Sequence, residues 1–229
     1  MENKNGQGIF YGVIGVATLI VAIIGATFAY FSASVSGNGA NIEGSTLDVA
    51  GNNLTLQVTR VLPSTAPTSG DALVPADMTE DSTGYAAALS NGCVNSGYTG
   101  CHLYSIAAGT STDLSSATIT LSIGTSAAAT TNWKYVVYDG TASSITTILT
   151  GSGSTANVMG TTSSPSSFTI QNGTALTTSG KTYYLLVYLH NTEGSQNGVG
   201  DGAENATGSY SGSVTLNAAG GQVKATFTA

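Results

Sequence analysis

The sequence predicts a mainly β protein: an antiparallel two-sheet β-sandwich or jelly roll preceded by one N-terminal apolar α-helix. The helix is indicated by residues 9–31, a continuous apolar segment without a charged residue. The sheets are indicated by short runs of alternating apolar and polar residues, separated by Gly, Asn and Ser turns. About nine such runs, with no alternation of strand and helix, favour a sandwich or jelly roll over a parallel α/β fold.

The apolar segment at residues 9–31 is longer than the core of an ordinary signal peptide and can span a bilayer, since about 20 residues suffice. Lys4 precedes it, and the next positive residue is Arg60. The positive-inside rule therefore places the N-terminus in the cytoplasm and the body of the protein outside.

Small residues recur every three or four positions along this segment, so they share one face of the predicted helix. They are Gly15, Thr18, Ala22, Gly25 and Ala29. Such a ridge lets helices approach closely, which favours packing against copies of the same helix. Small residues are also common in export signals, and both interpretations stay open here.

Three fates of the segment are compatible with the sequence. Cleavage near Ala29 or Ala33 would release the body, no cleavage would leave a membrane anchor, and cleavage after Gly6 or Gly8 would leave a bare apolar helix, as in pilins. The chain accordingly divides into an export, transmembrane or filament-core helix (1–31), a linker or donor strand (32–44) and a β-sandwich domain (45–229).

The body is predicted to contain strands wherever apolar residues alternate or cluster with β-branched and aromatic residues. The eight clearest are, in order, residues 54–59, 118–123, 133–138, 145–149, 168–170, 182–189, 210–216 and 222–227. Prolines break residues 63–75 into a loop, and residues 86–89 favour a helical turn. Residues 191–208 form a long Gly-rich loop.

One strand has two candidate core faces. Trp133, Tyr135 and Val137 share one face, and Val136 and Tyr138 share the other. We expect one of these sets to face the core, with partners on three other strands: Ile119, Leu121, Leu186 and Tyr188.

Composition excludes several classes of partner. Only 7% of residues are charged, the chain has five Lys and Arg residues in total, and the net charge is −7. Nucleic-acid binding therefore has no electrostatic basis. A Ser-, Thr- and Gly-rich surface with so little charge suits packing against identical copies or a coat of glycans. Candidate glycosylation sites of the form Asn-x-Thr occur at Asn53, Asn172 and Asn205.

Two cysteines, Cys93 and Cys101, flank a flexible Gly-containing stretch, and in an exported protein they predict a disulfide. Neither His102 nor His190 lies in a metallopeptidase motif, and the chain has no nucleophile-elbow or phosphate-loop motif. We therefore expect no catalytic residues, metal, cofactor or small-molecule substrate.

Two stretches resemble a known family of secreted proteins. Residues 25–31 read GATFAYF and residues 43–49 read EGSTLDV, with Ser45 inserted into a Gly-Thr-Leu-Asp pattern. This junction resembles the TasA/camelysin group, whose signal peptides are processed by the SipW-type peptidase. Archaeal-type pilins, which also join an apolar helix to a Ser/Thr-rich β-sandwich, are a second resemblance.

The TasA resemblance implies a jelly-roll-like domain in extracellular fibres or biofilm matrix, in which the mature N-terminal segment completes the sheet of the next subunit. Residues 34–49 would then be the donor segment, with Ile42, Leu47 and Val49 setting its register. Some members of that group carry a metallopeptidase label, but no matching ligand set is visible in this sequence, so that activity is not expected here.

The expected function is that of an extracellular structural subunit of a filament, pilus-like fibre or biofilm matrix. Its partners would be copies of itself, and the membrane through the N-terminal helix at least before processing. The alternative is a membrane-anchored monomeric surface or adhesion domain at the cell surface.

Overall fold

The strands of this protein form where branched and aromatic residues alternate with Ser and Thr. The computed structural model describes residues 42–49, 52–65, 67, 70–127, 132–150, 156–191, 208–219 and 221–229. Within these ranges it contains one helix, α2 (Ser82–Ser90), and fourteen strands. They are β1 (Ile42–Val49), β2 (Asn52–Leu62), β3 (Val94–Asn95), β4 (Tyr98–Thr99), β5 (Cys101–Thr110), β6 (Leu114–Thr125), β7 (Trp133–Thr141), β8 (Ser144–Ile148), β9 (Asn157–Val158), β10 (Gly160–Thr161), β11 (Ser166–Leu176), β12 (Lys181–Leu189), β13 (Tyr210–Ala218) and β14 (Gly221–Thr228).

The predicted mainly β fold with antiparallel sheets is confirmed. The apolar helix expected at residues 9–31 lies outside the described residues. Within the described part of the chain, no helix is long and apolar enough to cross a membrane.

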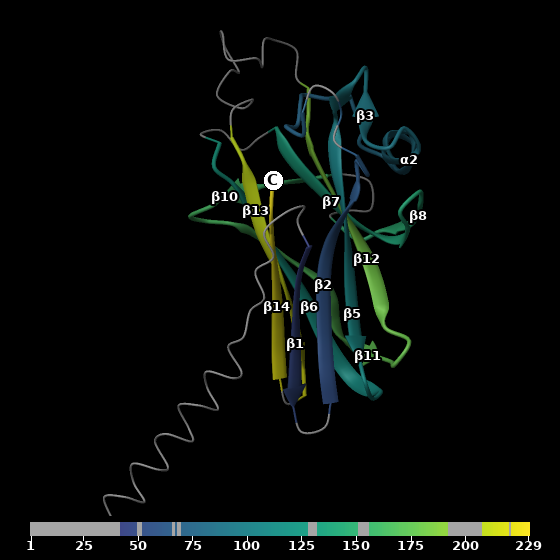
Figure 1. Cartoon of the computed structure of the whole chain (residues 1–229), viewed down its shortest axis with the longest axis vertical. Coiled ribbons are helices and arrows are strands. Elements are labelled where there is room, and N and C mark those ends of the chain that lie inside the picture. Colours follow the sequence, from purple (N-terminus) through teal and green to yellow (C-terminus); the bar gives the residue numbers. More distant parts are fainter. Residues whose placement is uncertain are drawn as a thin grey trace, which may run out of the picture. The chain divides into compact units, whose positions relative to one another are not determined.

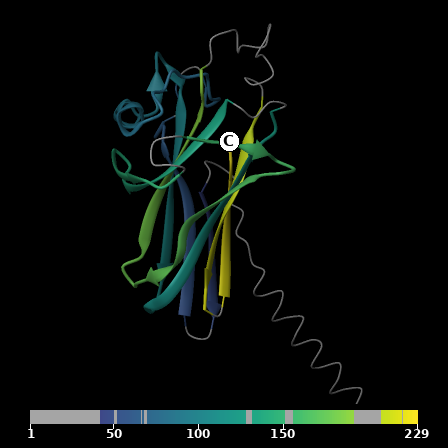
Figure 2. The same ribbon diagram turned by 180° about the vertical axis from the view of Figure 1, so that it is seen from behind.

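The longer strands form two sheets (Figure 1). The seven-stranded sheet has the order β1–β2–β5–β12–β7–β8, with β9 also paired to β7. In the five-stranded sheet, β6 pairs with both β11 and β13, β14 adds to β13, and the short β10 runs parallel to β6. The edge strands β1 and β14 lie side by side in both views (Figure 1; Figure 2).

The main core lies between residues of both sheets. Its members on the seven-stranded sheet include Leu56, Ile106 and Val187, and those on the five-stranded sheet include Leu121 and Val214, all of them fully buried. Alternation along each strand places these residues on one face of their sheet, so the two sheets share a single apolar cluster.

A second core lies on the other face of the seven-stranded sheet, beneath α2. Tyr85 and Leu89 of the helix pack there with Val136, Leu186 and Tyr188. Because α2 covers this face, β7 and β12 are buried on both sides. Burial on both faces explains why the sequence of β12 is apolar at nearly every position.

The prediction that one face of residues 133–138 meets the core was therefore too narrow. Trp133, Tyr135 and Val137 join the main core together with Ile119 and Leu121. The other set is buried as well, in the second core: Val136 and Tyr138 pack there with Leu186 and Tyr188.

The helical turn expected at residues 86–89 is part of a longer helix. Asp81 adopts an extended backbone before α2, and its Oδ1 accepts a 2.7 Å hydrogen bond from the Gly84 backbone N–H. This N-cap begins the helix four residues earlier than predicted, because it satisfies a donor that would otherwise be unpaired. Gly84 also lets the Thr79 carbonyl approach where a Cβ would collide.

Candidate functional site

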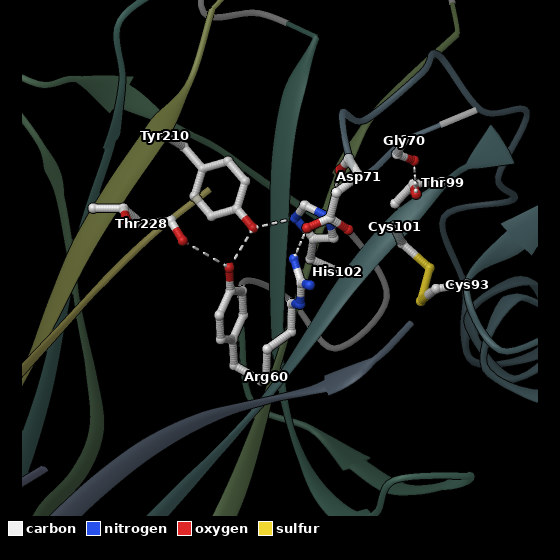
Figure 3. A network of polar contacts seen from close by, with 10 residues as sticks. Arg60, Gly70, Asp71, Cys93, Thr99, Cys101, His102, Tyr210 and Thr228 are labelled. Carbon is white, nitrogen blue, oxygen red and sulfur yellow. Dashed lines mark hydrogen bonds and ion pairs between the residues drawn. A yellow bond between two sulfur atoms is a disulfide. The ribbon is translucent and has the colours of Figure 1, made fainter. Parts of the chain in front are cut away.

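A chain of polar side chains crosses the main core and links the two sheets (Figure 3). His102 and Tyr104 lie on β5, and Tyr210 begins β13. The Tyr210 hydroxyl is 2.6 Å from His102 Nδ1 and 2.7 Å from the Tyr104 hydroxyl. Arg60, near the end of β2, pairs with the Asp71 carboxylate beside His102.

Strand alternation explains why a histidine is found in this core. His102 shares a face of β5 with Tyr104 and Ile106, and it is 1% exposed. The same face packs toward β13 and β14, so Tyr210 can reach both side chains. Burial of three polar groups at one place requires that each finds a partner.

The partners fix the direction of the hydrogen bonds. His102 Nε2 lies 3.0 Å from the Asp71 backbone carbonyl, which can only accept, so we assign the proton to Nε2. Nδ1 then accepts from the Tyr210 hydroxyl, and the Tyr210 oxygen accepts from Tyr104. The Thr228 carbonyl of β14, at the longer distance of 3.4 Å from the Tyr104 hydroxyl, is an alternative acceptor for the same Tyr104 proton.

Burial sets the charge states of this group. Desolvation lowers the pKa of His102, although the nearby Asp71 carboxylate opposes the shift. Desolvation also raises the pKa of Tyr104 to about 12 and raises the pKa of Tyr210. At neutral pH this group of side chains therefore consists of a neutral His102 imidazole and the protonated phenols of Tyr104 and Tyr210. A phenol with a raised pKa is a poor nucleophile, and the arrangement is suited to joining the sheets.

Acid should destabilise the wild-type protein more than a His102→Gln variant, which cannot titrate at this position. The pKa of His102 is lowered below the unfolded value of about 6.5, so below that pH the unfolded chain binds more protons than the native protein. The free energy of unfolding should be fully retained above about pH 6.5 and decline as the pH falls below it.

The measurement is urea unfolding at several pH values, followed by the fluorescence of Trp133. This is the one tryptophan of the chain, and its ring centroid lies 6.1 Å from that of Tyr210. An identical pH dependence in wild type and His102→Gln would contradict the assignment of a neutral buried His102.

The predicted disulfide is confirmed: Cys93 and Cys101 are bonded. The stretch between them, expected to be flexible, is a hairpin of β3 and β4 in which Asn95 pairs with Tyr98. Thr99 Oγ1 donates to the Gly70 carbonyl at 3.2 Å, so the hairpin is attached to the segment that carries Asp71 (Figure 3).

The predicted donor residues lie on β1. Ile42 pairs with Thr59, Leu47 with Leu54 and Val49 with Asn52, all within a hairpin formed with the chain's own β2. β1 is the edge strand of the seven-stranded sheet. Its exchange with another copy stays a prediction.

The other predicted site residues are only partly described. Asn53 and Asn172 are exposed, on β2 and on an irregular part of β11 respectively. Asn205 and the small-residue ridge, Gly15, Thr18, Ala22, Gly25 and Ala29, lie outside the described residues. Within the described ranges, no group of three His, Cys, Asp or Glu side chains could hold a metal ion.

The polar chain was missed by sequence reasoning. Its members come from residues far apart in the sequence, and only the alternation of His102, Tyr104 and Ile106 hinted that a histidine faces inward. Comparison of the sequence with protein-family models gives no match, and comparison with curated proteins gives none either.

Proposed function

We propose that this protein is a structural subunit of an extracellular filament, pilus-like fibre or biofilm matrix, and that it assembles with copies of itself through its N-terminal segment. In this proposal the two sheets form a jelly-roll-like sandwich, as the TasA resemblance implies. Two sheets with one shared apolar cluster support that assignment.

The observation that carries the proposal is the position of β1. It is the first described strand after the N-terminal apolar segment, and it occupies a sheet edge. Among the described residues, its ladder is to β2 alone, with β14 of the other sheet beside it. An edge strand can be exchanged for the same strand of a neighbour without disturbing the rest of the sheet. Backbone hydrogen bonds would then supply the affinity, and the alternate residues of β1 would supply the register.

The outward positions of the five-stranded sheet also suit contact with identical copies. On β6, β13 and β14, the outward residues alternate with the core residues. All of them carry a hydroxyl or amide group except Lys224, which carries the single charge. They are Thr118, Thr120, Ser122, Ser211, Ser213, Thr215, Asn217, Gln222, Lys224, Thr226 and Thr228. Repulsion between copies that meet on this face would be small.

The proposed location is outside the cell or at its surface, after export through the membrane. The Cys93–Cys101 disulfide supports this location, because such bonds persist in oxidising compartments and are rare in the cytosol. The charge-free segment at residues 9–31, preceded by Lys4, supports export.

A pair of introduced cysteines, Thr46→Cys with Thr55→Cys, tests whether β1 is donated. These residues are Cα partners across β1 and β2, at a separation that permits a disulfide. If β1 stays with its own chain, oxidation gives a covalent monomer. If it is donated in the assembled state, oxidation of filaments gives a ladder of covalent oligomers, and oxidation before assembly blocks assembly.

The matched control is Thr120→Cys with Thr215→Cys, which joins the adjacent strands β6 and β13 inside one chain. It should give only covalent monomers and should leave assembly intact. Filaments in which the β1–β2 pair also gives only monomers would contradict strand donation and leave packing of the apolar helices as the route. Gly25→Leu, on the small-residue ridge, should then block assembly.

The second candidate function is a membrane-anchored surface or adhesion domain that acts without polymerising. A disulfide-closed hairpin that exposes an aromatic side chain, Tyr98, favours it. Protein that stays monomeric at high concentration, with its apolar segment retained, would favour this function over the filament.

A further inference from the structure

The hairpin enclosed by Cys93 and Cys101 presents an aromatic side chain to solvent. Tyr98 is 50% exposed, and only one other large hydrophobic residue in the described ranges is exposed, Val158 at 41%. The disulfide closes the base of the hairpin, and the bond from Thr99 to Gly70 holds one of its strands. Tyr98 is thus displayed on a rigid support.

Positive φ angles recur along this loop, at the end of α2 and in the hairpin turn. Cys93 and Ser96 have φ values of 61° and 51°, and they are the two non-glycine residues with positive φ in the described part of the chain. Gly92 and Gly97 also adopt positive φ. Ser96 and Gly97 form the two-residue turn that tight hairpins favour, and the Gly92 and Cys93 N–H groups bond back to carbonyls of α2, so the shape of the loop is fixed.

A cavity of about 250 Å³ lies between this loop, α2 and residues 76–79. Its polar lining residues are exposed and carry carboxylate, hydroxyl or amide groups: Asp77, Thr79, Asn91 and Asn95. Its apolar lining, beside the disulfide, comes from Ala76, Met78, Ala87, Ala88 and Val94. None of the described lining residues is Lys, Arg or His, so the cavity offers no side-chain cation to an anionic ligand.

Tyr98 does not line this cavity itself, but it is paired with a residue that does. Asn95, which lines the cavity, is its cross-strand partner, so the two side chains share one face of the hairpin. A loop rich in Tyr, Ser, Asn and Gly combines a rigid aromatic contact with adaptable hydrogen bonding, at little cost in conformational entropy. An aromatic ring beside amide, hydroxyl and carboxylate groups matches a ligand with an apolar ring face and many hydroxyls.

We propose that the cavity between the disulfide hairpin and α2 binds a neutral sugar unit of a glycan, which stacks on Tyr98 and hydrogen-bonds with Asn95, Asn91 and Asp77. The size of the cavity suits one sugar ring better than a larger ligand, because drug-sized molecules occupy about 300–1,000 Å³. This inference is independent of filament assembly, and it gives either proposed function a means of adhering to glycans.

The test is binding to an array of neutral and acidic oligosaccharides, followed by titration calorimetry with the neutral oligosaccharide bound best. The variants are Tyr98→Ala, Tyr98→Phe and Asn95→Ala, each checked for an unchanged melting temperature. The matched control is Val158→Ala, which removes the other exposed apolar side chain, on β9.

Wild type should bind neutral and not acidic oligosaccharides. Tyr98→Ala should weaken binding by about tenfold or more, as expected for a central aromatic anchor, and Tyr98→Phe should retain most of it. Asn95→Ala should weaken binding, and Val158→Ala should leave it unchanged. Failure to bind any neutral oligosaccharide, selective binding of acidic ones, or equal affinities of wild type and Tyr98→Ala would overturn the proposal.

Discussion

Replacing Leu186 with Ala should lower the free energy of unfolding by about 2–5 kcal/mol. Leu186 is fully buried in the second core, and its cross-strand partners are Leu103 on β5 and Val136 on β7. Both neighbouring strands are hydrogen-bonded to β12, so they cannot move inward to fill the space that the substitution leaves.

Equilibrium denaturation measures this loss, with Thr182→Ala on the same strand as the control. Thr182 is exposed, so its replacement should change stability by no more than about 0.5 kcal/mol. A near-neutral effect of Leu186→Ala would show that α2 does not cover β12 as described.

The second large effect is expected from Cys93→Ala combined with Cys101→Ala, which should cost about 2–3 kcal/mol. The bond closes a short loop, so the stabilisation lies toward the lower end of the typical range of about 2–4 kcal/mol. Both sulfur-bearing residues are also buried in the second core, at 2% and 1% exposure.

Reduction provides an internal control for this prediction. Wild type with reductant should approach the stability of the double variant, and the variant itself should not respond to reductant. A wild-type melting curve that is the same with and without reductant, in protein shown by mass to be reduced, would contradict a stabilising role for the bond.

The mainly β fold could be predicted because alternation is a local signal. Residues 118–123 and 182–189, for example, lie within β6 and β12. β5 has no counterpart among the predicted strands, since Ala107, Ala108 and Gly109 have low strand propensity. It forms nonetheless between β2 and β12, where tertiary pairing outweighs propensity.

The candidate sites were harder to predict because they depend on pairings between distant residues. The disulfide could be predicted from two cysteines and an export segment. The contact between His102 and Tyr210 depends on two sheets meeting, and no local pattern signals it. Likewise, the exposure of Tyr98 follows from a hairpin whose turn uses positive φ at Ser96 and Gly97.

The claim that this protein builds extracellular filaments is tested most directly by electron microscopy of material sheared from the surface of cells that produce it, with mass spectrometry and N-terminal sequencing of the major subunit. We expect filaments in which this chain is the main component. The proposal would be contradicted if the surface material contained no filaments with this chain in them, and if the purified chain stayed monomeric at high concentration.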